Sequence, residues 1–264
     1  MNKQNKMLFT ADIGNTTITI VVYREDKALF TARINTNRRK TSDQYAYDVR
    51  HLLETKQCSI DSFDGAMISS VVPELSPVLK TAIYELLGVQ AMMLDVGVKT
   101  KLDIKCVNRG ELGADLIAGA VGAKAKYPLP CLIWDLGTAT KISVLDKTGT
   151  YLGCTISAGI KMCIEHLGSG TSLLNPIEIK KYNKPFGNVT FDSIASGTIV
   201  GTAVMLEGLS ERIIASLGEE NVSIIITGGL APIVLESVEK FTPIYDKNLI
   251  NDGLKLIYSY NQRG

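Results

Sequence analysis

The sequence predicts an α/β fold made of two duplicated lobes, with residues 1–127 in the first lobe and residues 128–264 in the second. The chain has 264 residues, 45% of them hydrophobic, which is enough for two domains of moderate size that each bury a core. Each half opens with three short strands that are followed by helical segments. In each half the first strand ends in Asp-x-Gly with a Thr nearby, at Asp12 and again at Asp135. Two such motifs in the same context indicate an internal duplication.

The first half has the pattern of a β-meander followed by helices and two further strands. Apolar runs and alternating apolar side chains predict its strands at 8–13, 17–22, 28–34, 65–72 and 91–94. Helical spacing predicts its helices at 42–56, 73–88 and 112–126. Thr41 or Ser42 can cap the first of these helices, and Gly88 is a good residue to end the second. Tyr127-Pro128 closes the third helix.

The second half repeats this order of elements. Its strands are expected at 132–136, 141–145, 150–156 and 222–226. Its helices are expected at 160–167, 191–217 and 248–260. Gly137-Thr138-Ala139 and a turn at 146–149 separate the first three strands, and the fourth strand ends in Thr227-Gly228-Gly229. Glycine-containing turns therefore follow strands in both halves.

Charge and composition exclude several classes of protein. The 28 Lys and Arg residues nearly balance the 27 Asp and Glu residues, which argues against a nucleic-acid-binding face, and the basic run at 37–40 is interpreted as a solvated turn. No run reaches the roughly 18 apolar residues that cross a bilayer, so we expect a cytoplasmic protein with no membrane partner. The five cysteines form no Cys-x-x-Cys pair, which favours free thiols over a disulfide framework or a zinc site.

The turns after the two Asp-x-Gly motifs are candidate phosphate-binding loops. Gly14, Asn15 and Thr16 form the first turn, and Thr138 follows Gly137 in the second. Tight turns rich in glycine and hydroxyl side chains let backbone N–H groups approach a phosphate closely. Two such turns placed face to face would hold the phosphates of a nucleotide. Either turn alone fits a glycine-containing hairpin equally well.

Three further sites are candidates for metal, adenine and acceptor chemistry. Asp12 could hold Mg²⁺, since this ion commonly takes one or two carboxylates besides phosphate oxygens. Gly228 and Gly229 would let the backbone approach a flat ligand such as adenine, although they also suit a simple connecting loop. Asp115 lies at the front of a predicted helix, where the helix dipole favours a carboxylate that could accept a hydroxyl proton. Asp115 also suits a plain cap of the first helical turn.

Seven ordered motifs resemble those of type III pantothenate kinases, a family in the superfamily of acetate and sugar kinases, Hsp70 and actin. The motifs span nearly the whole chain and are Asp12-Ile13-Gly14-Asn15-Thr16, Arg38-Arg39-Lys40-Thr41, Ile68-Ser69-Ser70-Val71-Val72-Pro73, Gly113-Ala114-Asp115, Asp135-Leu136-Gly137-Thr138-Ala139-Thr140, Tyr151-Leu152-Gly153 and Thr227-Gly228-Gly229-Leu230-Ala231-Pro232. The resemblance implies actin-like (ribonuclease H-like) lobes, each with a mixed five-stranded sheet flanked by helices. It also implies a homodimer that phosphorylates pantothenate to 4'-phosphopantothenate, the first step of coenzyme A biosynthesis, using ATP, Mg²⁺ and a monovalent cation, K⁺ or NH₄⁺.

The resemblance further implies roles for individual residues. The segment 12–19 and Thr138 match positions that contact ATP, and Asp135 matches a position that binds potassium. Asp115 matches the proposed proton acceptor. The substrate pocket is expected at Gly113, Ala114, Asp115, Leu116, Thr171 and Thr190.

The sequence departs from the family pattern mainly on the acceptor side. Leu116 stands where the family has an Arg, whose charge would pair with substrate or with developing negative charge. Lys141 follows Thr140 where the family usually has a second Thr, and it could restore a positive charge. The other departures are Cys106 for Tyr, Ala158 for Pro, Gly170 for Arg and Ser143 for Asp.

These departures leave two other functions open. The chain could be a catalytically weak paralogue that acts as a nucleotide-binding or regulatory protein, because Leu116 removes a charge from a phosphoryl-transfer site. It could also be a kinase for a different small hydroxyl-bearing acceptor, because the acceptor pocket is altered. Nucleotide binding without pantothenate binding would favour the first of these alternatives.

Overall fold

The computed structural model describes residues 7–105, 112–169 and 179–262. The chain folds into two compact units. Unit 1 holds Met1–Leu102, Asn108–Gly122 and Asn248–Gly264, and unit 2 holds Asp103–Val107 and Ala123–Lys247. The last helix of the chain therefore belongs to unit 1. The predicted division into lobes 1–127 and 128–264 describes where the sequence pattern repeats, and it stays a prediction.

The sheet of unit 1 has the strand order β3-β2-β1-β4-β5. Its strands are β1 (Met7–Ile13), β2 (Thr17–Arg24), β3 (Lys27–Asn35), β4 (Phe63–Ser70) and β5 (Ala91–Met93). The first three form an antiparallel meander, β4 runs parallel to β1, and β5 runs parallel to β4. This mixed five-stranded sheet is the one that the sequence predicts.

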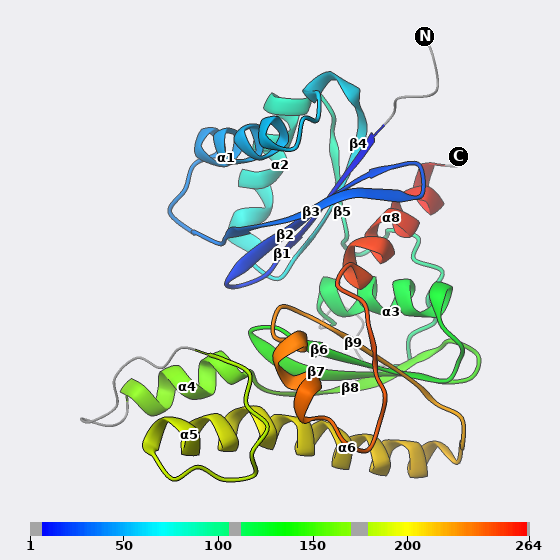
Figure 1. Cartoon of the computed structure of the whole chain (residues 1–264). Helices are drawn as coiled ribbons and strands as arrows, with labels where there is room; N and C mark the ends of the chain where they lie inside the picture. Colours follow the sequence, from blue (N-terminus) through cyan, green and yellow to red (C-terminus); the bar gives the residue numbers. More distant parts are fainter. Residues whose placement is uncertain (1–6, 106–111, 170–178, 263–264) are drawn as a thin grey trace. The chain divides into compact units, whose positions relative to one another are not determined.

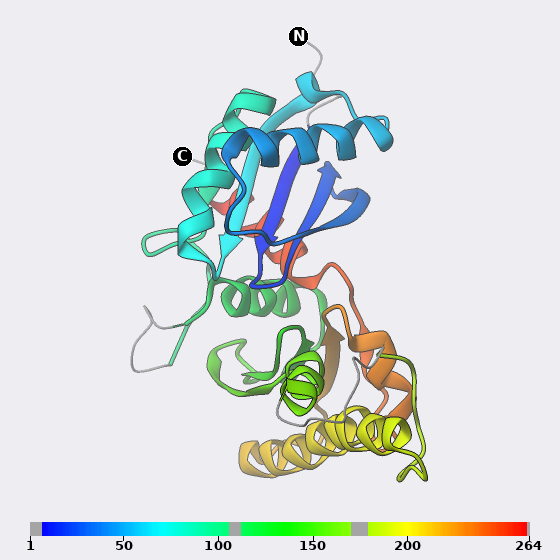
Figure 2. The ribbon, with the colours of Figure 1, turned by 90° about the vertical axis from the view of Figure 1, so that its left-hand side faces the viewer.

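Helices cover both faces of the unit 1 sheet (Figures 1 and 2). α1 (Ser42–Thr55) and α2 (Ser76–Leu87) lie over the face on which Phe9 and Ile13 of β1 are buried. α8 (Leu249–Gln262) lies on the opposite face, where Asn251 Nδ2 donates a hydrogen bond of 2.9 Å to Thr10 Oγ1. Because side chains alternate along a strand, Asp12 shares the face of Thr10 and not that of the α1–α2 core.

Local signals fix the ends of these helices. Thr41, one of the two residues predicted to cap α1, is its N-cap and forms a capping box with Gln44. Gly88 ends α2 with a φ of 68°, a left-handed conformation that glycine adopts without steric cost. α3 (Ala114–Lys126) begins two residues later than predicted. It packs closely on α8, since a Cβ added to Gly253 would lie only 1.8 Å from the Ala118 carbonyl oxygen.

The sheet of unit 2 repeats the topology of unit 1, with the order β10-β9-β6-β7-β8. Its strands are β6 (Cys131–Leu136), β7 (Ala139–Leu145), β8 (Tyr151–Ala158), β9 (Ser223–Thr227) and β10 (Ile244–Tyr245). β6, β7 and β8 form the antiparallel meander, β9 runs parallel to β6, and β10 runs parallel to β9. Each strand of unit 2 therefore has a counterpart in unit 1, which confirms the duplication.

Helices pack against one face of the unit 2 sheet around Trp134. They are α4 (Ile160–Ser169), α5 (Thr190–Ala195), a π-helical turn (Ser196–Val200), α6 (Gly201–Leu217) and α7 (Ala231–Val234). A short 3-10 turn follows α7 at Leu235–Ser237, and unit 1 has two such turns, at Ile60–Ser62 and Pro73–Leu75. The indole Nε1 of Trp134 donates to Ser210 Oγ at 3.0 Å. Among the described residues, Thr190–Leu217 is long and apolar enough to cross a membrane by length and composition alone, and half of its apolar window is buried inside the fold.

The turn between β7 and β8 is organised by Asp146. Its Oδ1 accepts hydrogen bonds from the Thr148 backbone N–H at 2.8 Å and from the Thr150 N–H at 3.0 Å. Burial acts to raise the pKa of the Asp146 carboxyl. The hydrogen bonds from Thr148 and Thr150, together with the charge of Lys105, outweigh that effect and hold the pKa below its usual value.

Candidate functional site

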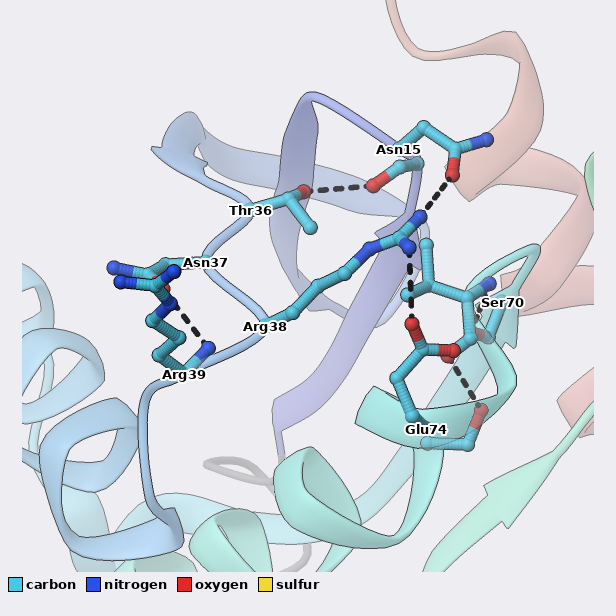
Figure 3. A network of polar contacts seen from close by, with 10 residues as sticks. Asn15, Thr36, Asn37, Arg38, Arg39, Ser70 and Glu74 are labelled. Atoms are coloured by element: carbon cyan, nitrogen blue, oxygen red, sulfur yellow. Dashed lines mark hydrogen bonds and ion pairs between the residues drawn. The ribbon is translucent and has the colours of Figure 1, made fainter.

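The loop after β1 is held in one conformation by hydrogen bonds (Figure 3). The Gly14 N–H donates to the Thr17 carbonyl at 3.0 Å, and Thr36 Oγ1 donates to the Gly14 carbonyl at 2.7 Å. Arg38 Nη2 donates to Asn15 Oδ1 at 2.9 Å. A Cβ added to Gly14 would lie 3.0 Å from the Thr17 carbonyl oxygen, so the loop has little room for a side chain there. The predicted phosphate loop is thus a braced hairpin turn.

The sequence does not link Thr36 or Arg38 to this loop, although Arg38 belongs to one of the seven motifs. The Thr36 N–H also donates to the Thr16 carbonyl at 3.0 Å, and the Arg38 guanidinium pairs with Glu74 at 3.2 Å. The sequence predicts a solvated turn for the basic run at 37–40, and 58% of the Arg38 side chain is exposed. Its link to Asn15 joins positions 23 residues apart, which no local pattern reveals.

Asp12 lies at the end of β1, half-buried, with hydroxyl residues on both neighbouring strands. Ser69 Oγ of β4 donates to Asp12 Oδ1 at 2.6 Å, and Thr19 is the partner of Asp12 across β2. Among residues 7–105, 112–169 and 179–262, no three His, Cys, Asp or Glu side chains form a metal-binding group. A carboxylate beside hydroxyls still fits Mg²⁺, because this ion usually takes few protein ligands and keeps water and phosphate oxygens as the rest.

The start of α3 lies at the same end of the unit 1 sheet. The Val71 N–H, just after β4, donates to the Ile13 carbonyl at 3.0 Å, and a Cβ at Gly113 would lie 3.7 Å from Val71 Cγ1. Gly113, just before α3, therefore lies close to Val71, which follows β4 next to the carboxyl end of β1. Asp115 Oδ1 accepts a 2.9 Å hydrogen bond from the Leu116 N–H, and Leu116 itself is only 8% exposed.

The corresponding loop of unit 2 is closed by a second set of backbone contacts. The Gly137 N–H donates to the Ala139 carbonyl at 3.1 Å, and the Gly159 N–H donates to the Thr138 carbonyl at 3.2 Å. Gly228 has a φ of 96°, and a Cβ there would lie 2.4 Å from the Leu136 carbonyl oxygen. Within unit 2 the fold therefore brings the glycine loop after β9 against the loop after β6.

Asp135 forms an ion pair with Lys141 in this unit. The two residues are cross-strand partners in β6 and β7, and Lys141 Nζ lies 2.8 Å from Asp135 Oδ2. Each of the two side chains is 13% exposed. An ammonium group already lies on the carboxylate to which the resemblance assigns potassium, so the residues here do not fit an added monovalent cation.

The remaining predicted residues divide into two groups. Ala158 ends β8 opposite Ala139, and Thr190 begins α5 with an exposed side chain. Cys106, Gly170 and Thr171 lie outside the described residues. The binding roles assigned to Thr171 and Thr190 stay predictions.

Comparison with known proteins places this geometry in a family. A family model described as type III pantothenate kinase matches residues 8–212. The type III pantothenate kinase of Finegoldia magna is 34% identical over 258 residues, which cover 97% of this chain and 98% of that protein. The type III pantothenate kinase of an Exiguobacterium species is 36% identical over 257 residues, which cover 97% of this chain and 100% of that protein.

Solved structures share the architecture at low identity. The activator of the 2-hydroxyisocaproyl-CoA dehydratase from Clostridium difficile with bound ADPNP superposes with a TM-score of 0.58 at 13% identity, covering 97% of this chain and 95% of that chain. The ethanolamine utilization protein EutJ from Carboxydothermus hydrogenoformans gives a TM-score of 0.55 at 14% identity, covering 95% of this chain and 89% of that chain. These likenesses concern the fold alone, and they confirm duplicated actin-like lobes.

Proposed function

The chain belongs to the type III pantothenate kinase family, and we propose on that basis that it transfers the γ-phosphoryl group of ATP to pantothenate. The products are 4'-phosphopantothenate and ADP, and the reaction is the first step of coenzyme A biosynthesis. The observation that supports the proposal, besides the family, is the location of two carboxylates in unit 1. Asp12 lies at the end of β1 next to the braced glycine loop, and Asp115 follows Gly113, which lies close to Val71 just after β4.

The glycine loop of each unit, taken by itself, is proposed to bind phosphate oxygens of ATP. The loop at Gly14, Asn15 and Thr16 is proposed to present backbone N–H groups other than that of Gly14, which donates to Thr17, and the Thr16 hydroxyl to phosphate oxygens. The loop around Thr138 is proposed to do the same in unit 2, with the Gly137 N–H already donating to Ala139. Because the Gly14 loop is already braced by Thr36, little ordering is needed when phosphate binds. Gly228 and Gly229 are assigned to the adenine side.

Asp12 is proposed to hold Mg²⁺, directly or through water. The hydrogen bond from Ser69 fixes the orientation of the carboxylate, as partners of metal-binding carboxylates commonly do. When bound, Mg²⁺ neutralises negative charge on the β- and γ-phosphates.

Asp115 is proposed to accept the proton of the primary hydroxyl of pantothenate, or to orient that hydroxyl for in-line attack on the γ-phosphorus. A side chain at the first turn of α3 is held by the rigid helix, which suits positioning. Gly113 lies so close to Asp115 that a Cβ there would meet Asp115 Oδ1 at 2.5 Å. A larger residue at 113 would therefore displace the carboxylate.

Leu116 is the observation that favours a second function. Its side chain is buried, so the position lacks both the charge and the exposure of an arginine that contacts substrate. Loss of such a charge can lower a phosphoryl-transfer rate by about 10³-fold or more. The alternative is a catalytically weak paralogue that binds nucleotide in a regulatory role. Calorimetry separates the two functions, because only the kinase is expected to bind pantothenate as well as ATP.

A cytoplasmic homodimer is the proposed form of the enzyme. Large apolar side chains are exposed on β8, on α6 and before α5, at Ile156 (65%), Val204 (60%) and Phe186 (77%). Apolar side chains that are exposed in a single chain can be covered by a second copy in a dimer. Sedimentation of the full chain at assay concentration tests the proposal, and a single species of monomer mass would contradict it.

A coupled assay of ADP release tests the proposed reaction. Wild-type protein with ATP, Mg²⁺ and pantothenate is expected to turn over, and Asp115→Asn is expected to lose about 10²–10⁴-fold in kcat, the usual contribution of a general base. Asp103→Asn, which changes a carboxylate of unit 2, is the matched control and should keep its rate. Equal rates for Asp115→Asn and wild type would remove Asp115 from the mechanism. No turnover by wild type would favour the regulatory alternative.

A further inference from the structure

The pairing of Asp135 with Lys141 follows directly from the β6–β7 hairpin. The two residues are opposite one another in the antiparallel register, so their side chains project from the same face of the sheet. The Lys141 ammonium lies 2.8 Å from Asp135 Oδ2, and only 13% of either side chain is exposed. The sheet therefore places the Lys141 ammonium next to the Asp135 carboxylate, where both groups are largely shielded from water.

The duplicated unit provides an internal comparison. Asp12 of β1 and Asp135 of β6 occupy the same place in the two Asp-x-Gly motifs and in the two sheet topologies. Asp12 faces Thr19 on the antiparallel strand and Ser69 on the parallel strand. Asp135 instead faces Lys141 and Thr227. One copy of the motif thus has a hydroxyl at the antiparallel partner position, and the other copy has an ammonium.

We propose that the Lys141 ammonium takes the place of a monovalent cation at Asp135, so that this protein is independent of K⁺ and NH₄⁺. K⁺ and the ammonium carry the same charge, and a second cation beside the same oxygen would be repelled by the first. The tethered group also needs no binding from solution, because the hairpin holds it at a high effective concentration. The part of the proposal that concerns turnover rests on the proposed function, whereas the part that concerns cation binding does not.

The test compares wild type with Lys141→Thr, which supplies a hydroxyl at that position as Thr19 does in unit 1. Thermal unfolding is followed without ATP through the fluorescence of Trp134, the one tryptophan of the chain, which is buried in unit 2 beside Asp135. Each protein is measured in about 100 mM KCl, NH₄Cl or choline chloride, so that ionic strength is constant. Lys147→Thr is the control, because it removes an exposed lysine of the same unit that pairs with Glu219.

Wild type and Lys147→Thr should have the same Tm in all three salts. Lys141→Thr leaves a shielded carboxylate without its cation, so its Tm should fall in choline and recover by about 2–4 °C or more in K⁺ or NH₄⁺. A specific rise of the wild-type Tm in K⁺ would overturn the proposal. A Lys141→Thr protein that folds but ignores K⁺ and NH₄⁺ would do so as well.

Turnover provides a second readout that separates this proposal from the proposed function. Wild type should phosphorylate pantothenate equally well in KCl and in choline chloride, and Lys141→Thr should require K⁺ or NH₄⁺. Turnover that needs K⁺ in wild type would overturn cation independence while supporting the kinase. If wild type shows no turnover in any salt, the kinase proposal fails, and the Tm series still decides whether Lys141 replaces the cation. Should Lys141→Thr fail to fold, the wild-type salt series alone decides.

Discussion

Replacement of Gly228 by alanine tests whether the close approach of two loops in unit 2 requires a glycine. Gly228 has a φ of 96°, and an added Cβ would lie 2.4 Å from the carbonyl oxygen and 2.6 Å from the carbonyl carbon of Leu136. The unfavourable φ costs about 1–3 kcal/mol, and overpacking against rigid backbone costs about 1–3 kcal/mol more. Gly228→Ala should therefore lower the free energy of unfolding by about 4 kcal/mol.

Gly218→Ala is the matched control for this substitution. Gly218 also has a positive φ, 65°, but nothing lies within 4 Å of its added Cβ, so only the conformational cost of about 1 kcal/mol remains. Urea unfolding followed by Trp134 fluorescence reports on the same unit. With a slope of about 2 kcal/mol per molar urea, the midpoint should fall by about 2 M for Gly228→Ala and by about 0.5 M for Gly218→Ala. Equal falls would refute the steric argument.

The same substitution links stability to nucleotide binding. The Leu230 N–H donates to the Leu136 carbonyl at 3.1 Å, so displacement of Gly228 also displaces the strand end that precedes Thr138. Gly228→Ala should weaken ATP binding measured by calorimetry, whereas Gly218→Ala should leave it unchanged. An unchanged affinity of Gly228→Ala for ATP would mean that the loop at Gly228 does not contribute to nucleotide binding.

Three further outcomes are expected. Burial raises the pKa of the Cys131 thiol to about 12. Iodoacetamide at about pH 8 should therefore label the exposed Cys154 and should not label Cys131 until the protein unfolds. Rapid labelling of Cys131 in the folded protein would contradict this. The pKa of the Asp146 carboxyl is lower in the folded state than in the unfolded state, so its ionised form stabilises the fold above about pH 4, and this contribution is lost as the pH falls further. Urea titrations should therefore show a difference in stability between wild type and Asp146→Asn that shrinks at about pH 3. Asn251→Ala removes a buried hydrogen bond to Thr10 and should cost about 1–3 kcal/mol by circular dichroism, and no loss would mean that the hydrogen bond contributes little.

Most of the architecture could be predicted because the strands of both meanders are marked by local patterns. Alternation over 17–22 and the apolar run at 8–13 locate β2 and β1 within two residues. β10 was missed because it has only two residues, paired with Ile225 and Ile226 of β9, and so short a strand has no periodicity. The helix predicted over 191–217 was correct in extent, but its π-helical turn has no signal in apolar spacing.

The site was less predictable than the fold, because its contacts join residues that are distant in sequence. The Asp-x-Gly motifs locate both loops, yet the braces from Thr36 and Ser69 come from other parts of the chain and depend on register. The position of the Lys141 ammonium also follows from register, which places it opposite Asp135 once the turn of the hairpin is fixed. The sequence alone named Lys141 as a departure and could not assign its partner.

Phosphorus NMR of wild-type protein incubated with ATP, Mg²⁺ and pantothenate tests the central claim most directly. A phosphate monoester resonance that grows as the γ-phosphate of ATP declines, and that is absent when pantothenate is omitted, is the predicted result. Loss of that resonance in Asp115→Asn should accompany it. An ATP spectrum that stays unchanged with folded wild-type protein, in potassium and in choline alike, would contradict the assignment of this chain as a working pantothenate kinase.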